Sequence, residues 1–266
     1  MLAELALAGR PDVSLATVQG HAAALTRVDR KYLVPVPLVR RLLTELSHDW
    51  AVLDVAGRRS THYRTTYFDT ADLWTARAHV QGRRRRWKVR SRLYIEDGLC
   101  RLEVKTRDGR GQTVKVYAPS SPDSYGKLSL ADRDFVTRTL ADRAIPVDVA
   151  ALVPTIEVAY ERMTLARTRR DPARLTLDWQ VTCDLDGEQV RLDEGHVLVE
   201  TKGDRRPSEA DRLLIGLGAR PTSFSKYTAG AALLREDIAD NDVRRLRGRV
   251  LHVGPGTTPQ IRRQTA

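Results

Sequence analysis

The chain of 266 residues contains only two cysteines, Cys100 and Cys183. Two cysteines are too few for a disulfide framework, and no Cys and His spacing indicates a zinc site. No apolar run approaches the roughly 18 residues of a membrane helix. The opening MLAELALAGRPD lacks the basic region and the longer apolar run of a signal peptide. These absences argue against a secreted or membrane-spanning protein, and we expect a cytoplasmic one.

Lysine and phenylalanine are also scarce. The 45 basic residues include seven lysines, and the chain has three phenylalanines. Few aromatic residues look exposed, which argues against a surface for stacking nucleic-acid bases, so no specific nucleic acid is expected. The formal net charge is nevertheless +11, which predicts an acidic substrate or partner.

The order of the predicted elements indicates an α+β fold. Asp-Gly pairs at 97–98 and 186–187 separate alternating runs, as in β-hairpins. We expect one domain over 27–240, a loosely ordered leader over 1–26 and a disordered basic tail over 241–266. Helices are expected at 37–48, 129–144, 207–217 and about 222–238. Strands are expected at 26–35, 62–70, 83–95, 99–107, 112–118, 154–165, 174–185 and 189–203.

The stretch RRRRWKVRSRLY, residues 83–94, alternates with a period of two. Arg84, Arg86, Lys88, Arg90 and Arg92 share one face of the expected strand, and apolar residues such as Trp87 and Val89 share the other. A single strand of this kind is most simply explained as a solvated face. The same alternation recurs at 101–107, 113–117 and 174–181, with few acids among the cations. If the sheet closes into a barrel, these cations can point inward.

A lumen of like charges is costly unless an anion occupies it. Lysine and arginine donate charge-assisted hydrogen bonds to phosphoryl oxygens. A carboxylate among them can hold a divalent metal ion that bridges phosphates. The alternation therefore predicts a site for an extended chain of phosphates.

A series of short motifs runs along most of the chain. They are RKYLV (30–34), YFDT (67–70), KVRSRLY (88–94), LEVKT (102–106), YERM (160–163), RLTLD (174–178), VLVETKG (197–203) and SKY (225–227). In this order, from about residue 27 to 236, they resemble the VTC domain. This domain is the polyphosphate polymerase branch of the CYTH/triphosphate tunnel metalloenzyme superfamily.

The resemblance implies a closed antiparallel β-barrel of eight strands with flanking helices. It also implies a reaction that depends on Mn²⁺ or Mg²⁺, with ATP and inorganic polyphosphate as partners. Glu200 is the expected metal ligand, with Glu103, Asp29 and Asp178 as candidates for a second ligand. No nucleophile is expected. The expected phosphate-binding residues are Lys31, Lys88, Arg90, Arg92, Lys105, Lys115, Arg162, Arg174, Lys202 and Lys226.

The strand at 27–31 departs from the acid-x-acid-x-Lys pattern of the hydrolytic and cyclase branches. Arg27 stands where the first acid would be, and only Asp29 is left. We therefore favour a polymerase that transfers the γ-phosphoryl group of ATP to a polyphosphate chain. A tripolyphosphatase or nucleoside triphosphatase is the first alternative. A non-catalytic polyphosphate- or nucleic-acid-binding protein is the second.

Overall fold

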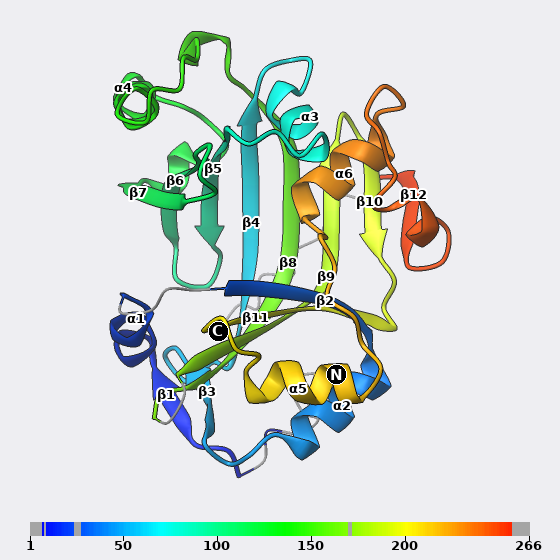
Figure 1. The fold of residues 1–266 in the computed structure, drawn as a ribbon. Helices are drawn as coiled ribbons and strands as arrows, with labels where there is room; N and C mark the ends of the chain where they lie inside the picture. The colour runs from blue at the N-terminus through cyan, green and yellow to red at the C-terminus, as the bar shows by residue number, and fades with distance from the viewer. Residues whose placement is uncertain (1–6, 8, 24–27, 170–171, 257–266) are drawn as a thin grey trace, which may run out of the picture.

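The computed structural model describes residues 7, 9–23, 28–169 and 172–256. Twelve strands in this part of the chain form one sheet (Figure 1). They are β1 (Asp12–Ser14), β2 (Val28–Pro35), β3 (Trp50–Asp54), β4 (Ser60–Asp69), β5 (Arg86–Tyr94), β6 (Leu99–Arg107), β7 (Thr113–Ser120), β8 (Val153–Arg167), β9 (Ala173–Leu185), β10 (Glu188–Leu192), β11 (His196–Gly203) and β12 (Leu251–Pro255). The α-helices are α1 (Leu15–Ala23), α2 (Val36–Glu45), α3 (Trp74–Val80), α4 (Leu130–Ala141), α5 (Glu209–Gly216) and α6 (Lys226–Leu234).

The sheet is antiparallel except where β1 pairs with β3, but it is not a closed barrel of eight strands. A continuous path runs β2-β11-β9-β8-β4-β5-β6-β7. In the described part of the chain, β2 pairs only with β11 and β7 only with β6. The predicted closure is therefore wrong, because the two strands that would have to meet are both free edges. The predicted strand number is also wrong, since β1, β3, β10 and β12 lie outside this path.

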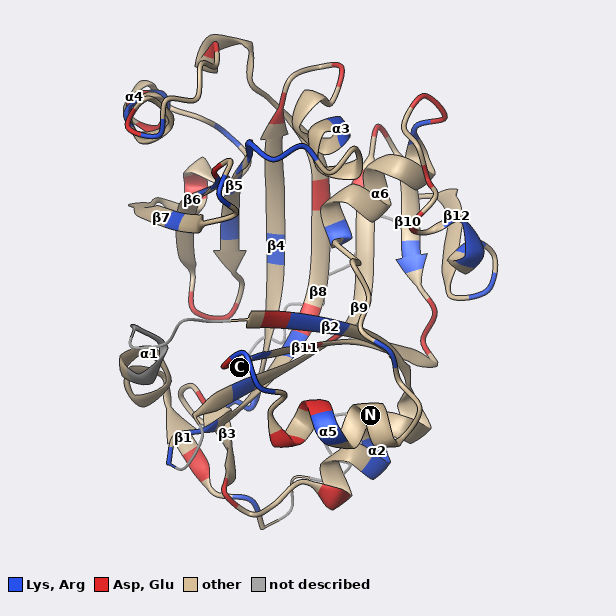
Figure 2. Ribbon diagram, viewed as in Figure 1, with Lys and Arg blue, Asp and Glu red and all other residues tan. Residues whose placement is uncertain are grey.

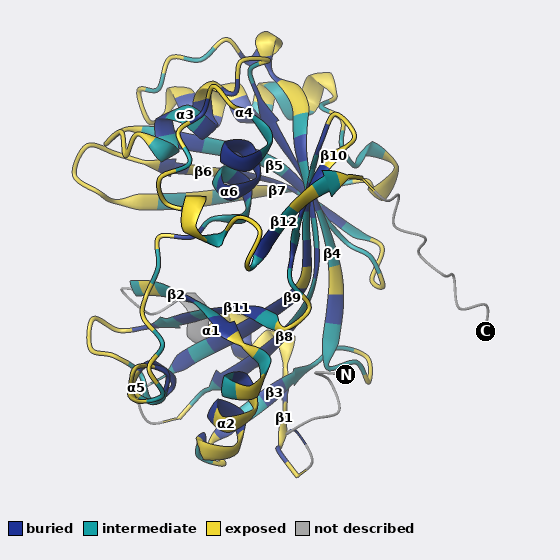
Figure 3. Cartoon of the chain, turned by 90° about the vertical axis from the view of Figure 1, so that its right-hand side faces the viewer, coloured by how far each residue is buried: buried dark blue, intermediate teal, exposed yellow. Residues whose placement is uncertain are grey.

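The sheet branches because β8 and β9 are long enough to pair with different strands at their two ends. The end of β8 leaves β4 and pairs with β3. The first part of β9 pairs with β11 and its last residues pair with β10. Between these parts the register of β8 and β9 shifts at Ala159/Glu161, and Gln180 has a positive φ of 51°. Such a bulge increases local twist, and Figure 3 shows β2, β11, α2 and α5 in a lower lobe, apart from α3, α4 and α6.

Helices cover the apolar residues of each lobe. Val136 and Leu140 of α4 pack with Trp87 and Val89 of β5, so the apolar parity of this strand is buried as predicted. In the lower lobe, α2 and α5 cover β2, β9 and β11. In the upper lobe, α6 packs with Ile156 and neighbouring residues of β8, β9 and β10. The cationic parity of β5 therefore faces the concave side of the sheet, which α6 partly fills.

Several predicted segments carry structure that the sequence did not indicate. The strand predicted at 189–203 is two strands, β10 and β11. Within 1–26, β1 pairs with β3, and the buried Arg10 donates to the carbonyls of Leu43 and Leu46 at 2.6 and 2.8 Å. Within 241–266, β12 pairs with β10. The boundaries of the domain remain a prediction, and residues 1–6, 8 and 257–266 lie outside the described residues. No helix that the structure describes has the length and apolarity of a membrane span.

Close packing of α6 on β9 makes Gly230 intolerant of a larger residue. A Cβ at this position would lie 2.7 Å from Cys183 Cβ. We expect Gly230→Ala to lower the free energy of unfolding by about 1–3 kcal/mol, the usual cost of overpacking. Gly216→Ala is the control, since a Cβ on Gly216 would meet no atom within 4 Å. Urea unfolding of both variants measures the difference, and equal stability would contradict the packing argument.

Candidate functional site

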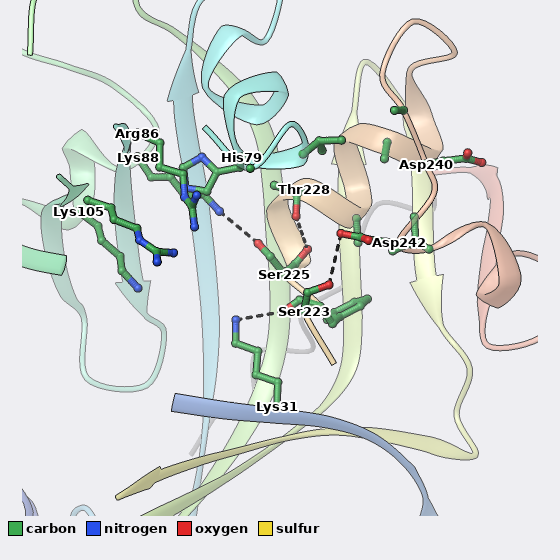
Figure 4. A pocket seen from close by; sticks show the side chains of 18 of the residues that line it. Lys31, His79, Arg86, Lys88, Lys105, Ser223, Ser225, Thr228, Asp240 and Asp242 are labelled. Atoms are coloured by element: carbon green, nitrogen blue, oxygen red, sulfur yellow. Dashed lines mark hydrogen bonds between the residues drawn. The ribbon is translucent and has the colours of Figure 1, made fainter. Parts of the chain in front are cut away.

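A cavity of about 440 Å³ lies between α6 and the strands that carry the predicted lysines. Lys31 of β2, Lys88 of β5 and Lys105 of β6 line it, with Ser225 at the start of α6 (Figure 4). Lys88 and Lys105 occupy facing positions in the β5–β6 ladder. We call this space the central cavity.

The three lysines of the central cavity have no ion pair with a carboxylate among the described residues. Lys88 Nζ donates to Ser225 Oγ at 3.2 Å, and Lys31 Nζ donates to the Phe224 carbonyl at 3.0 Å. Burial lowers the pKa of Lys88 well below its ordinary value, and repulsion from Lys31 and Lys105 lowers it further. Burial also lowers the pKa of Lys31 and Lys105. Three lysines that line one cavity and form no ion pair with an acid make a site suited to an anion.

A second group of cations surrounds the buried carboxylate of Glu103 on β6. Arg90 Nε lies 2.7 Å from Glu103 Oε2, and Lys115 Nζ lies 2.6 Å from Oε1. Arg92 NH1 lies further away, at 3.9 Å, and the buried Arg92 Nε has no hydrogen-bond partner. Burial opposes ionisation of Glu103, but Arg90, Arg92 and Lys115 together hold its pKa well below the ordinary value. Arg92 thus retains an unused donor.

A third group is centred on Asp178 of β9, which is 1% exposed. Arg162 binds both carboxylate oxygens, at 2.5 and 2.7 Å, and Lys226 of α6 binds Oδ2. Burial raises the pKa of Asp178, but Arg162 and Lys226 outweigh it and keep the pKa low. This aspartate therefore joins β8, β9 and α6 through ion pairs, although its single charge compensates only one of the two cations.

Glu200 and Asp29 flank one ammonium group on the β2–β11 ladder. Lys202 Nζ lies 2.8 Å from Glu200 Oε1 and 3.1 Å from Asp29 Oδ2. Burial raises the pKa of Glu200, but Lys202, Lys31 and Arg162 hold it well below its ordinary value. Arg174 of β9 faces Lys202 in the ladder. Two carboxylates thus bracket a position that holds a positive charge.

The YFDT motif supports these cations through aromatic rings. Asp69, fully buried, accepts hydrogen bonds from the backbone N–H groups of Thr75 and Ala76 at the start of α3 and from the Tyr227 hydroxyl. Tyr227 stacks on Tyr67, with 4.2 Å between ring centroids. Lys88 Nζ lies 5.1 Å from the centroid of the Tyr227 ring.

Tyr67 holds a second cation on the same face, because its hydroxyl accepts a hydrogen bond from Arg90 at 3.0 Å. The motif thereby links α3, α6 and two of the predicted phosphate-binding residues. The motif is among those that resemble the VTC domain, but the sequence predicted no role for its residues. The sequence signal that could have indicated this role is an aspartate directly after two aromatic residues in a predicted strand.

His79 also lines the central cavity, although no pattern in the sequence indicated it as a site residue. Its Nδ1 donates to the Thr75 carbonyl at 2.9 Å, so Nε2 carries no proton when the ring is neutral. Burial, then Lys88, lowers the pKa of His79 to about 2. The ring therefore adds no positive charge to the cavity at neutral pH.

The structure brings the predicted site residues to one concave face rather than to separate surfaces. Arg92 and Arg162 lie 5.7 and 5.5 Å from the centroid of the Tyr63 ring, which joins the Glu103 and Asp178 groups. Two candidates for a second metal ligand, Glu103 and Asp178, are each held by several cations, whereas Asp29 lies beside Glu200 through Lys202. Arg27 lies outside the described residues. No group of three or more His, Cys, Asp or Glu side chains in the described ranges could hold a metal ion.

Comparison with known proteins places the chain in a family. The VTC domain family matches residues 26–235, most of the chain. The chain therefore belongs to the VTC domain family, which confirms the resemblance of its ordered motifs.

Solved structures give weaker likenesses. HpAC1 from Hippeastrum, for which a dominant triphosphatase activity is described, is 15% identical with a TM-score of 0.48, covering 78% of this chain and 96% of its own. PH1819 from Pyrococcus horikoshii OT3 is 11% identical with a TM-score of 0.44, covering 79% and 98%. No curated protein matches the chain.

Proposed function

We propose that this protein is a polyphosphate polymerase that transfers the γ-phosphoryl group of ATP to the end of a polyphosphate chain. Membership of the VTC domain family supports an activity on polyphosphate or triphosphate. The observation that carries the proposal is the set of three lysines that line one cavity, Lys31, Lys88 and Lys105, none of which forms an ion pair with a carboxylate in the described structure. Phosphoryl oxygens supply the missing negative charge.

The carboxylates of the site and His79 support phosphate rather than water as the acceptor, because none of them is a strong base. Hydrolysis benefits from a general base whose pKa lies near neutral pH. The nearby carboxylates of Glu103, Asp178 and Glu200 all have a lowered pKa, and the pKa of His79 is about 2. All four are weak bases. A polyphosphate end already carries an anionic oxygen and needs no deprotonation before it attacks.

Glu200 and Asp29 are the two carboxylates that would hold a divalent metal ion, on which the tunnel-fold family generally depends, and substrate phosphates would have to supply its other ligands. Glu200 and Asp29 both contact Lys202 Nζ, so their oxygens converge on a place where a cation is already favoured. Mg²⁺ in phosphoryl-transfer sites is commonly held by one or two carboxylates together with substrate phosphates. When bound, Mn²⁺ or Mg²⁺ would withdraw charge from the phosphates during transfer.

The side chains of the site hold the donor and acceptor phosphates in line. Lys31, Lys88 and Lys105 bind phosphoryl oxygens in the central cavity, while Arg90 and Arg92 bind them beside Glu103. An oxygen at the chain end forms a bond to the γ-phosphorus, and the bond from that phosphorus to the β-phosphate oxygen breaks. ADP leaves with the electron pair. Positioning and charge stabilisation supply the catalysis, as is usual for phosphoryl transfer.

The purified chain, incubated with ATP and Mn²⁺, tests this proposal. Long phosphate chains on a gel, with ADP released in equal amount to the phosphate incorporated, are the expected result. Orthophosphate as the sole phosphate product would favour the tripolyphosphatase or nucleoside triphosphatase. Binding of polyphosphate without turnover would favour the non-catalytic alternative.

Binding of triphosphate should take up protons. Burial and repulsion lower the pKa of Lys88, and burial lowers the pKa of Lys115 to about 8. A bound anion favours the charged form and raises both values. Affinity for tripolyphosphate is therefore highest at a pH below the pKa values of the two lysines in the free protein. It falls as the pH rises above these values, because the lysines must then take up protons on binding. Near the pKa of Lys115, this loss begins at about pH 8.

Isothermal titration calorimetry in buffers of different ionisation enthalpy measures this uptake. The control is Lys88→Arg, which keeps the positive charge but does not titrate in this range. It should take up fewer protons than the natural chain. Equal uptake by both would show that Lys88 is already fully charged before the anion binds.

A further inference from the structure

A group of five arginines lies at the edge of the central cavity, and one of them, Arg107, also lines it. Arg83, Arg84 and Arg85 are exposed in the segment between α3 and β5, and Arg107 and Arg110 are exposed at the end of β6 and in the loop that follows. Figure 2 shows the first segment as a continuous basic run between α3 and β5. Arg85 Nε lies 3.9 Å from the position that a Cβ on Gly109 would take, so the two segments are neighbours. We call these five residues the rim arginines.

The rim arginines are not neutralised by the surrounding protein. None of them forms an ion pair with a carboxylate in the described residues. The nearest acid in sequence, Asp108, accepts hydrogen bonds from the backbone N–H groups of Arg110 and Gln112 at 2.9 and 2.8 Å, so its carboxylate shapes the loop. Clustered cations repel one another. Binding of an anion to this patch is therefore favourable, because it relieves the repulsion.

The rim continues the row of cations that enters the central cavity. Lys88 faces Lys105 in the β5–β6 ladder, and the next pair of the same parity is Arg86 facing Arg107. Both arginines line the cavity together with the lysines. Successive residues of one parity are about 7 Å apart along a strand, so the row from Arg92 to Arg86 spans roughly 20 Å. This row is longer than a triphosphate. Arg84, predicted on the same strand face, lies instead with Arg85 in a bend before β5, which places further cations next to the Arg86 end of the row.

We propose that the rim arginines bind the part of a polyphosphate chain that projects from the central cavity. This inference rests on the proposed function and specifies its substrate as a chain longer than the cavity can enclose. Each phosphate outside the cavity then meets a cation instead of water alone. Affinity consequently rises with chain length, and a growing chain leaves the protein less often between additions.

The test compares two phosphate ligands on the full chain. The rim variant is Arg83→Gln/Arg84→Gln/Arg85→Gln. The control, Arg40→Gln/Arg41→Gln/Arg212→Gln, removes the same charge from exposed positions on α2 and α5, in the other lobe. Calorimetry at several salt concentrations measures the affinity for tripolyphosphate and for a long linear polyphosphate of narrow length distribution.

We expect the rim variant to lose at least about tenfold in affinity for the long chain and no more than about twofold for tripolyphosphate. The slope of log affinity against log salt concentration for the long chain should fall by about one for each phosphate that the variant no longer neutralises. The control variant should bind both ligands like the natural chain.

Unchanged long-chain affinity in the rim variant overturns the inference and leaves the proposed function standing. An equal loss in the control variant also overturns it, because net charge alone would then explain the effect. Failure of the natural chain to bind either phosphate ligand overturns the proposed function itself. A rim variant that loses affinity for single-stranded DNA but not for polyphosphate would assign the patch to nucleic acid instead.

Discussion

Replacing Glu200 by Gln should lower kcat for phosphoryl transfer by about 100-fold or more, the usual cost of removing one group that stabilises transition-state charge. The substitution keeps the shape of the side chain but removes the charge that, with Asp29, brackets Lys202. Lys202 retains Asp29 as a partner at 3.1 Å, so the β2–β11 ladder should stay intact. Steady-state kinetics over a range of Mn²⁺ concentrations measures the effect.

Affinity for tripolyphosphate without added metal separates binding from catalysis in this variant. We expect it to be kept or increased, because the site loses a negative charge. Glu157→Gln is the matched control, since this carboxylate binds Arg64 and Tyr125 rather than the cations of the cavity. Full turnover by Glu200→Gln, or the same loss in Glu157→Gln, would remove Glu200 from the proposed metal site.

The second large effect is expected on stability. Asp178→Asn leaves Arg162 and Lys226 without their carboxylate, although both side chains are mostly buried, at 15% and 13% exposed. Breaking a buried ion pair from one side typically costs about 3–5 kcal/mol. We expect the free energy of unfolding to fall by about 3 kcal/mol, at the lower end of that range, because Asn still accepts a hydrogen bond. Urea unfolding followed by circular dichroism gives the value.

Tripolyphosphate should restore part of this loss, since an anion in the cavity compensates the two unpaired charges. The gain in stability with tripolyphosphate should be larger in Asp178→Asn than in the natural chain at the same ligand concentration, as tighter binding to the folded state requires. Glu209→Gln is the control. Its carboxylate binds Ser47, Trp50 and Arg167 in the lower lobe, so tripolyphosphate should not compensate its loss more than it stabilises the natural chain. Equal gains in all three proteins would argue that Asp178 does not border the phosphate site.

The alternation of β5 and β6 could be predicted because a strand places successive side chains on opposite faces. Trp87 and Val89 had to be buried, and this sent Lys88 and Arg90 to the other side. Local chemistry likewise predicted α4, where Ser129 caps the helix and Asp132 completes a capping box. The family motifs identified the cations that the structure gathers on one face. Strand alternation, helix capping and short motifs all depend on residues that are close together in the sequence, so they can be read from it directly.

Contacts between segments that are far apart in the chain could not be predicted from the sequence in this way. Whether β2 pairs with β7 depends on the twist of every strand between them, and in the described strands these two do not pair. The role of Asp69 depends on Tyr227, which is far away in the chain. The pairing of β1 with β3 and of β12 with β10 also joins remote segments. Composition alone indicated a leader and a tail there.

By itself, the sequence determined that a row of lysines and arginines lies on one face of a sheet, opposite an apolar face, and that the chain belongs among VTC domains. Only the tertiary structure decided which of these cations are neutralised, because a carboxylate compensates a charge at a distance of a few ångströms, whatever its place in the chain. Glu103 and Asp178 form ion pairs with the arginines around them, whereas Lys31, Lys88 and Lys105 meet in a cavity and have no acid in ion-pair contact in the described structure. That difference turns a basic strand into a site that an anion completes.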